Sequence, residues 1–159
     1  MKMKKIYLEA DVMRTIRTGE KTQIRNVMEP QPELEELLPF CVFFGSEIKD
    51  NAPCRPGDIL CLQENDPAYD GYGVCAYVKA VRAERLQEIS PLDIRAEGIN
   101  APQNDEWDCE MSEEVMNQFE FEEAWDKLAE SKNLNQYRWE NNPWVWVIEF
   151  ERMNGKEAA

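Results

Sequence analysis

The sequence has 159 residues, of which 43% are hydrophobic and 10% aromatic, and its seven glycines and nine prolines are too few for a low-complexity chain. This length and composition are typical of one compact domain rather than of a disordered protein. The chain has no histidine, which excludes histidine-based nucleophile pairs, general bases and metal ligands. Its formal net charge of -14 disfavours non-specific binding to nucleic-acid phosphates.

The N-terminal residues predict a short strand, a helix and a second strand. Residues 6–8 have the composition of a strand, and residues 11–18 place apolar side chains on one helical face. Gly19 suits the left-handed position just past a helix end. Residues 23–28 then favour an extended segment.

The middle of the chain predicts further strands separated by turns. Residues 32–38 are compatible with a short helix, and residues 40–44 read as a strand. A Pro-Gly-Asp turn at 56–58 precedes a strand over 59–64, and residues 72–81 alternate enough for another strand.

The C-terminal half predicts two helices and a final strand. Ser90 is a helix N-cap with proline at the next position, and Gly98 ends that helix. A longer, interrupted helix is expected over 112–131. Its apolar set is Val115, Met116, Phe119, Trp125 and Leu128. Residues 144–150 are strongly strand-like. One face of that strand carries Trp144, Trp146, Ile148 and Phe150.

These elements together indicate an α+β fold with a curved or barrel-like sheet. No internal repeat or linker divides the sequence, so we expect a single domain over residues 1–159 with its core at about 4–152.

The charge is distributed unevenly along the chain. Residues 1–30 carry a net charge of +3, whereas residues 105–130 carry eleven acids against one base. Two interpretations of the acidic segment stay open. It is either a solvated helix face, or an array over 105–123 that binds a basic surface on another protein.

The chain has five cysteines, an odd number, and no two of them have the C-x-x-C spacing. They are Cys41, Cys54, Cys61, Cys75 and Cys109. The N-terminus does not resemble a signal peptide, and no stretch approaches the roughly 18 apolar residues of a membrane span. We therefore expect a cytoplasmic protein with mostly buried free thiols, without a metal, a cofactor or a membrane contact.

Several segments occur in an order that is characteristic of one family. They are Gly-Glu-Lys-Thr-Gln-Ile-Arg at 19–25, Pro-Gly-Asp-Ile-Leu at 56–60, Glu-Arg-Leu-Gln-Glu-Ile at 84–89, Asp93 with Ala96-Glu97-Gly98, and Asn-Pro-Trp-Val-Trp-Val-Ile-Glu-Phe at 142–150. This order resembles the ASCH domains of the PUA-like superfamily, especially the small ASCH-like proteins of phages and prophages.

The resemblance implies a partly closed, mixed β-barrel of about six strands with helices at its rim. It also implies a cleft beside residues 19–25 that takes RNA or a nucleotide-like ligand. The candidate ligand-binding residues are Lys21, Thr22, Arg25, Glu64 and Tyr77.

Some small ASCH proteins hydrolyse the amide of acetylated cytidine with a lysine, a threonine and a glutamate. The resemblance retains Lys21 but puts Ile24 and Tyr77 at the threonine and glutamate positions. Thr22 and Glu64 are the candidate replacements, although Thr22 points away from Lys21 on an extended segment.

We therefore predict a non-catalytic RNA- or nucleotide-binding protein. Two alternatives remain: an acidic interaction module or nucleic-acid mimic, and a nucleoside amidohydrolase with relocated catalytic groups. Two interpretations of Lys21 and Arg25 stay open: they either clamp an anionic ligand or pair with carboxylates. In the second case Glu64 is the expected partner of Lys21. Trp144 and Trp146 are expected to fill the core rather than to stack on bases.

Overall fold

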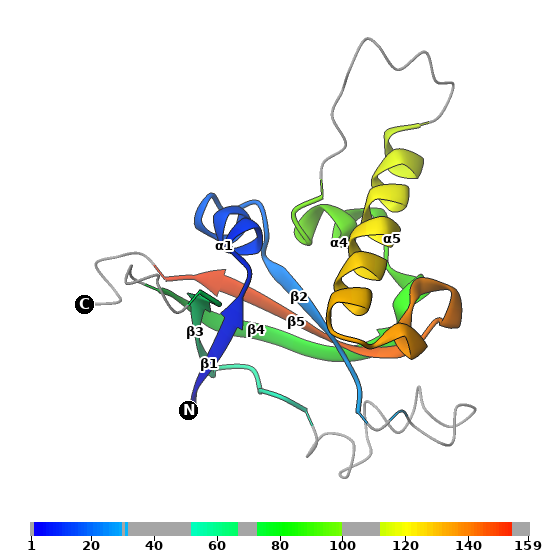
Figure 1. Cartoon of the computed structure of the whole chain (residues 1–159). Coiled ribbons are helices and arrows are strands. Elements are labelled where there is room, and N and C mark those ends of the chain that lie inside the picture. Colours follow the sequence, from blue (N-terminus) through cyan, green and yellow to red (C-terminus); the bar gives the residue numbers. More distant parts are fainter. Residues whose placement is uncertain (1, 30, 32–51, 67–72, 100–111, 154–159) are drawn as a thin grey trace.

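A computed structural model describes residues 2–29, 31, 52–66, 73–99 and 112–153 (Figure 1). The predicted helix at 32–38, the predicted strand at 40–44 and the acidic residues 105–111 lie outside the described residues.

The described strands form one mixed, open sheet in the order β1-β3-β4-β5-β2. β1 and β3 are parallel, and the other three pairings are antiparallel. The strands are β1 (Met3–Leu8), β2 (Gln23–Val27), β3 (Ile59–Glu64), β4 (Val74–Arg85) and β5 (Trp144–Arg152). The predicted α+β class is confirmed. The described strands form an open sheet of five, whereas the family resemblance implied a partly closed barrel of about six.

In the described ranges, three α-helices accompany the sheet, and β2 runs between α1 and the α4–α5 pair (Figure 1). They are α1 (Ala10–Arg17), α4 (Pro91–Ala96) and α5 (Glu113–Ser131), with short 3-10 turns at Leu86–Glu88, Asn135–Tyr137 and Trp139–Asn141. The caps follow the sequence: the Ser90 hydroxyl accepts a hydrogen bond from the Asp93 N–H at 3.1 Å. Gly19 and Gly98 end α1 and α4 with φ of +84° and +86°, which glycine adopts without a steric penalty.

Two cores lie on opposite faces of β5, because successive side chains of a strand alternate between faces. Ile148 and Phe150 pack in a first core with α1, β3 and the first half of β4. Val145 and Val147 pack in a second core with α4 and α5. The predicted burial of Trp144 and Trp146 is confirmed, since both are less than a tenth exposed and pack on Met28 and Ala83.

The buried face of α5 differs from the one expected from sequence. The helix is continuous over Glu113–Ser131, and its buried residues recur every four positions: Asn117, Phe121, Trp125 and Ala129. Val115, Phe119 and Leu128, which the sequence placed on the apolar face, are exposed. Of the expected set, Trp125 is buried against the second core and Met116 is half-buried.

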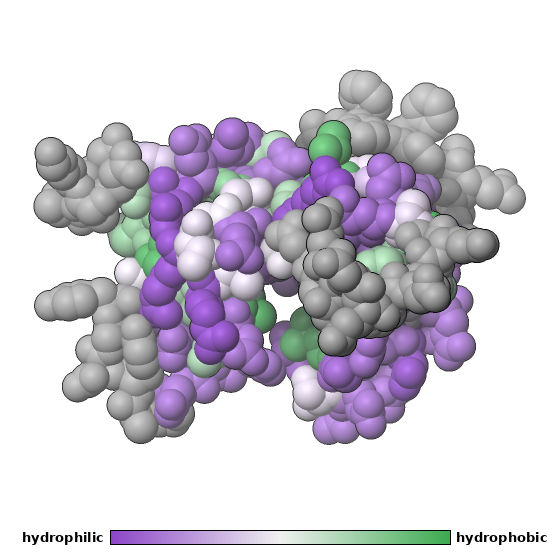
Figure 2. All heavy atoms as spheres, turned by 90° about the horizontal axis from the view of Figure 1, so that it is seen from above, coloured by the Kyte–Doolittle hydropathy of each residue, from purple (hydrophilic) through white to green (hydrophobic). Residues whose placement is uncertain are grey.

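Among the described helices, none combines the length and apolar character needed to cross a bilayer. The face of the molecule seen in Figure 2 is mostly hydrophilic, with hydrophobic residues confined to small areas.

Candidate functional site

The segment around Lys21 is held between α1 and α4 by backbone hydrogen bonds. The Lys21 N–H donates to the Thr15 carbonyl at 3.0 Å, and the Thr22 N–H donates to the Ala96 carbonyl at 2.7 Å. Gly98 packs closely here, since a Cβ on it would lie 3.3 Å from the Lys21 Cβ. The chain between α1 and β2 therefore has a fixed path that aims Lys21 at the end of α4.

Lys21 is paired with a carboxylate rather than open to solvent. Its ammonium contacts the Glu97 carboxylate and donates to the Glu97 carbonyl at 3.2 Å. Both side chains are about nine-tenths buried. Of the two interpretations left open by the sequence, the structure therefore supports ion pairing for Lys21.

Arg25 is also paired, and it is almost completely buried. It stands opposite Val147 in the β2–β5 register, which places it on the sheet face covered by α4 and α5. Only 1% of its side chain is exposed. Its guanidinium lies 2.6 Å from Glu84, 3.3 Å from Asp93 and 3.6 Å from Glu97.

These contacts belong to a larger charged network, which we call the ion-pair cluster. Its cations are Lys21, Arg25 and Arg82, and its carboxylates are Glu84, Asp93, Glu97 and Glu149. Three positive charges thus meet four negative ones, so the cluster as a whole is slightly negative. A group of cations compensated in this way offers little net attraction to phosphate.

Arg82 joins β4, β5 and α4 within this cluster. Its guanidinium lies 2.8 Å from both Asp93 and Glu149 and 3.2 Å from Glu84. Burial acts to lower the pKa of Arg82, but its hydrogen bonds to Glu149 and Glu84 and the charge of Asp93 raise it above its ordinary value. Arg82 therefore stays charged and fixes these carboxylates in place.

The cluster retains hydrogen-bonding capacity that the described protein groups do not use. Arg25 Nη1 and Gln23 Oε1 are buried and have no hydrogen-bond partner. Arg25 Nε, Glu84 Oε1 and Glu97 Oε1 make no hydrogen bond but lie in ion pairs, at 2.6 Å for Arg25 Nη2–Glu84 Oε1 and 3.6 Å for Arg25 Nε–Glu97 Oε1. A buried polar atom without a partner is costly.

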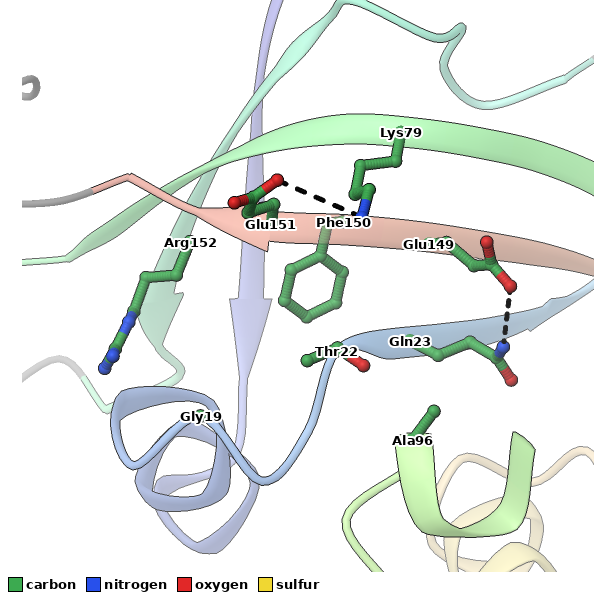
Figure 3. Close-up of a pocket in the computed structure, with 9 residues that line it drawn as sticks. All are labelled: Gly19, Thr22, Gln23, Lys79, Ala96, Glu149, Phe150, Glu151 and Arg152. Atoms are coloured by element: carbon green, nitrogen blue, oxygen red, sulfur yellow. Dashed lines mark hydrogen bonds and ion pairs between the residues drawn. The ribbon is translucent and has the colours of Figure 1, made fainter. Parts of the chain in front are cut away.

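An open hollow of about 450 Å³ lies beside the cluster (Figure 3). Its lining residues are Gly19, Thr22, Gln23, Lys79, Ala96, Glu149, Phe150, Glu151 and Arg152. In Figure 3, Thr22, Phe150 and Ala96 point toward a common space. Gln23 and Glu149 approach each other at 3.5 Å, and Lys79 and Glu151 at 4.0 Å. We call this feature the Thr22 hollow.

Of the predicted ligand-binding residues, only Thr22 lines this hollow. Lys21 and Arg25 come together through their shared contact with Glu97. The expected pairing of Glu64 with Lys21 is wrong, because Glu64 ends β3 beside α1 and binds Arg17 at 2.9 Å. Tyr77 lies on β4 opposite Ile59 and is 40% exposed.

The catalytic groups that the amidohydrolase reaction would require do not lie together. Ile24, which stands at the position of the threonine, is buried in the first core with α1. Lys21 contacts Glu97, while Thr22 faces the Thr22 hollow. Among the described residues, no cluster of cysteines and carboxylates could hold a metal ion.

Sequence reasoning missed the carboxylates that neutralise Lys21 and Arg25. Glu84, Asp93 and Glu97 all lie in the segments that carry the family resemblance. The available signal was that they are acidic and that their segments belong to the same pattern as the G-x-K segment.

The described acidic residues of the 105–123 segment lie on α5. Glu113 makes an exposed ion pair with Arg95, and Glu123 makes one with Lys127. Glu114 and Glu120 are exposed on the same helix. The helical part of the segment is thus a solvent-facing surface.

The fold is similar to that of two solved bacterial proteins. The ASCH domain from Lactobacillus crispatus JV V101 has a TM-score of 0.53 and 11% identity, and the match covers 95% of this chain and 79% of that one. A DUF984 protein from Enterococcus faecalis V583 has a TM-score of 0.53 and 12% identity, covering 96% and 80%. No family model and no curated protein matches the sequence. The chain therefore has an ASCH-like fold.

Proposed function

We propose that this protein binds a small nucleoside-type ligand in the Thr22 hollow. The supporting observation is a hollow of about 450 Å³ with polar groups around its wall, a size within the usual range of small-molecule sites. The Thr22 hydroxyl offers a donor and an acceptor to the edge of a base. Ala96 supplies apolar contact surface.

The charges of the Thr22 hollow favour a ligand without phosphates. Lys79 and Arg152 are balanced by Glu149 and Glu151 among its lining residues, and the whole chain has a net charge of -14. A phosphate entering the hollow would meet no excess of positive charge and would be repelled at long range. The proposal thus keeps the base and sugar of the RNA- or nucleotide-like ligand expected from the resemblance and omits its phosphates.

Lys21 and Arg25 have a supporting role in this proposal. They hold α4 against β2 and β4 through Glu97, Asp93 and Glu84. Because Ala96 and Gln23 line the hollow, the ion-pair cluster keeps two of its walls in position. Lys21 and Arg25 act as positioning residues, and neither forms a phosphate clamp.

Thr22→Val tests the proposal, because it removes the hydroxyl while preserving the side-chain shape. Thermal unfolding is followed with cytidine, N4-acetylcytidine, uridine, adenosine and guanosine. Binding raises the melting temperature by mass action. We expect at least one nucleoside to stabilise the wild type and to stabilise Thr22→Val less, and chromatography of the N4-acetylcytidine sample to show no turnover.

Thr18→Val is the matched control. Thr18 is exposed, and its hydroxyl donates to the Thr15 carbonyl at 3.1 Å outside the hollow. It should respond to nucleosides as the wild type does. If no nucleoside stabilises the wild type, or if Thr22→Val and Thr18→Val respond alike, the proposed site is wrong.

A second candidate function is binding of a basic protein surface through α5. The observation that favours it is that Val115 and Phe119 are 43% and 56% exposed on a helix surrounded by glutamates. Apolar contact within an acidic rim is a pattern found in protein interfaces. Binding of a basic partner that weakens with salt and is lost in Phe119→Ala would support this function.

A further inference from the structure

Two cysteines that belong to neither the Thr22 hollow nor the ion-pair cluster face each other across adjacent strands. Cys61 on β3 stands directly opposite Cys75 on β4. Their strand neighbours Leu60, Leu62 and Ala76 are buried in the first core. Cys61 and Cys75 therefore lie on the other face of the sheet, where both are half-buried and neither forms a disulfide.

The hydrogen bonds of the sheet show which kind of cross-strand pair this is. The Ile59 N–H donates to the Lys2 carbonyl at 2.8 Å, so the odd-numbered residues of β3 bond toward β1. The Val78 N–H donates to the Asp58 carbonyl at 2.9 Å, so the even-numbered positions bond toward β4. The Cys75 carbonyl likewise accepts from the Met153 N–H, away from β3. Cys61 and Cys75 thus form a non-hydrogen-bonded pair.

That geometry is compatible with a covalent link between the two residues. In a non-hydrogen-bonded antiparallel pair the Cα atoms are about 4.5 Å apart and the side chains approach closely. A disulfide needs a Cα separation of about 4.4–6.8 Å. The backbone of β3 and β4 therefore needs little movement to accept a disulfide at this position.

The two thiols are close enough to influence each other, because Cys75 is among the causes of the shifted pKa of Cys61. Burial raises the pKa of Cys61, the neighbouring Cys75 raises it further, and the Lys5 ammonium on β1 acts in the opposite direction. Because the thiolate is the reactive form, exchange at this pair should be slow at neutral pH and should accelerate as the pH rises.

We propose that Cys61 and Cys75 are a redox-active dithiol that closes into a reversible cross-strand disulfide on reaction with a low-molecular-weight disulfide such as oxidised glutathione. The Cys61 thiol releases its proton to solvent, and the thiolate attacks one glutathione sulfur. The glutathione S–S bond breaks, a mixed disulfide forms and one glutathione thiolate leaves.

The Cys75 thiolate then attacks the Cys61 sulfur and displaces the second glutathione. The protein loses two electrons and two protons, and oxidised glutathione is reduced to two thiols. Cys54 is a poor competitor among the described cysteines, because it is buried and desolvation raises its pKa to about 11. The product ties β3 to β4.

The test uses the native 159-residue chain incubated with oxidised glutathione, followed by alkylation, mass measurement and peptide mapping. We expect the thiols of Cys61 and Cys75 to be lost and the two residues to appear in one cross-linked peptide pair. The mass of that pair should be about 2 Da below the sum of its reduced peptides. Dithiothreitol should restore both thiols. The reaction rate should rise roughly tenfold from pH 7 to pH 8, following the thiolate fraction.

Two variants separate the proposed closure from general thiol reactivity. Cys75→Ser should retain a glutathione adduct on Cys61, since the resolving thiol is missing, whereas Cys54→Ala should still form the 61–75 cross-link. A stable adduct on wild-type Cys61, a cross-link to another cysteine, or an unreactive Cys61 in both the wild type and Cys75→Ser would overturn the proposal. Melting curves should show Cys75→Ser folded, so that its result reports on the thiols.

Discussion

Arg25 is a buried cation whose charge is compensated by carboxylates from β4 and α4. Removing it leaves Glu84, Asp93 and Glu97, which are largely buried, without one of their cations. Breaking a buried pair by removing one partner costs about 3–5 kcal/mol. We expect Arg25→Met to lower the free energy of unfolding by about that amount, measured by urea denaturation.

Arg14→Met is the control for that measurement. Arg14 pairs with Asp11 at 3.2 Å, and the two side chains are 75% and 86% exposed. An exposed pair of this kind contributes about 0.5 kcal/mol or less. Equal losses in Arg14→Met and Arg25→Met would contradict the structural role given to the ion-pair cluster.

Asp58 is a residue whose contribution depends on pH. Its carboxylate accepts hydrogen bonds from the Lys2 and Arg55 N–H groups at 3.0 and 2.9 Å, and these bonds lower its pKa below the ordinary 3.8. A lowered pKa stabilises the fold above the ordinary value, and the stabilisation is lost as the pH falls through the folded-state value.

Asp58→Asn should therefore melt at a lower temperature than the wild type at neutral pH. The difference should shrink as thermal melts are repeated at successively lower pH below 3.8, because Asp58 then gains a proton in the folded wild type and its carboxylate loses its charge. A difference that stays constant from neutral to acidic pH would show that these hydrogen bonds do not depend on the charge.

At the scale of elements, α5 presents two phenylalanines with opposite surroundings. Phe121 is 5% exposed and packs on Trp125 and Trp139, whereas Phe119 is 56% exposed. We expect Phe121→Ala to cost about 3–5 kcal/mol of unfolding free energy. Phe119→Ala should stay within about 0.5 kcal/mol. Denaturant titration of both variants measures these losses. A larger loss in Phe119→Ala than in Phe121→Ala would show that Phe119, rather than Phe121, lies on the core-facing side of α5.

Local signals predicted most elements of the fold. β3 begins and ends where the sequence indicated, and α4 begins after the Ser90 cap and ends before Gly98, because turn and cap residues act on their immediate neighbours. The buried face of α5 was not predictable in this way. Apolar residues occur on two sides of that helix, and only packing against α4 and β5 selects one of them.

The candidate site was less predictable than the elements, because its contacts join distant parts of the chain. Lys21 meets a carboxylate 76 residues away, and Arg25 meets one 68 residues away. Sequence reasoning identified both cations and the segment that holds them. It assigned the wrong partner to Glu64, because nothing local shows that the end of β3 lies beside α1.

At the scale of the whole molecule, the charge distribution bears most directly on ligand class. The net charge is -14, the ion-pair cluster carries three cations against four carboxylates, and the surface seen in Figure 2 is mostly hydrophilic. A ligand with phosphates would approach this molecule against repulsion that salt screens only in part. An uncharged nucleoside would not meet that barrier.

The preference for a ligand without phosphates is tested by calorimetric titration. The nucleoside that raises the melting temperature most is compared with its own 5′-monophosphate. We predict that the nucleoside binds more tightly than the monophosphate at low salt, and that added salt narrows the gap by screening the repulsion. Tighter binding of the monophosphate, weakened by salt, would instead identify a working phosphate clamp and would contradict the account.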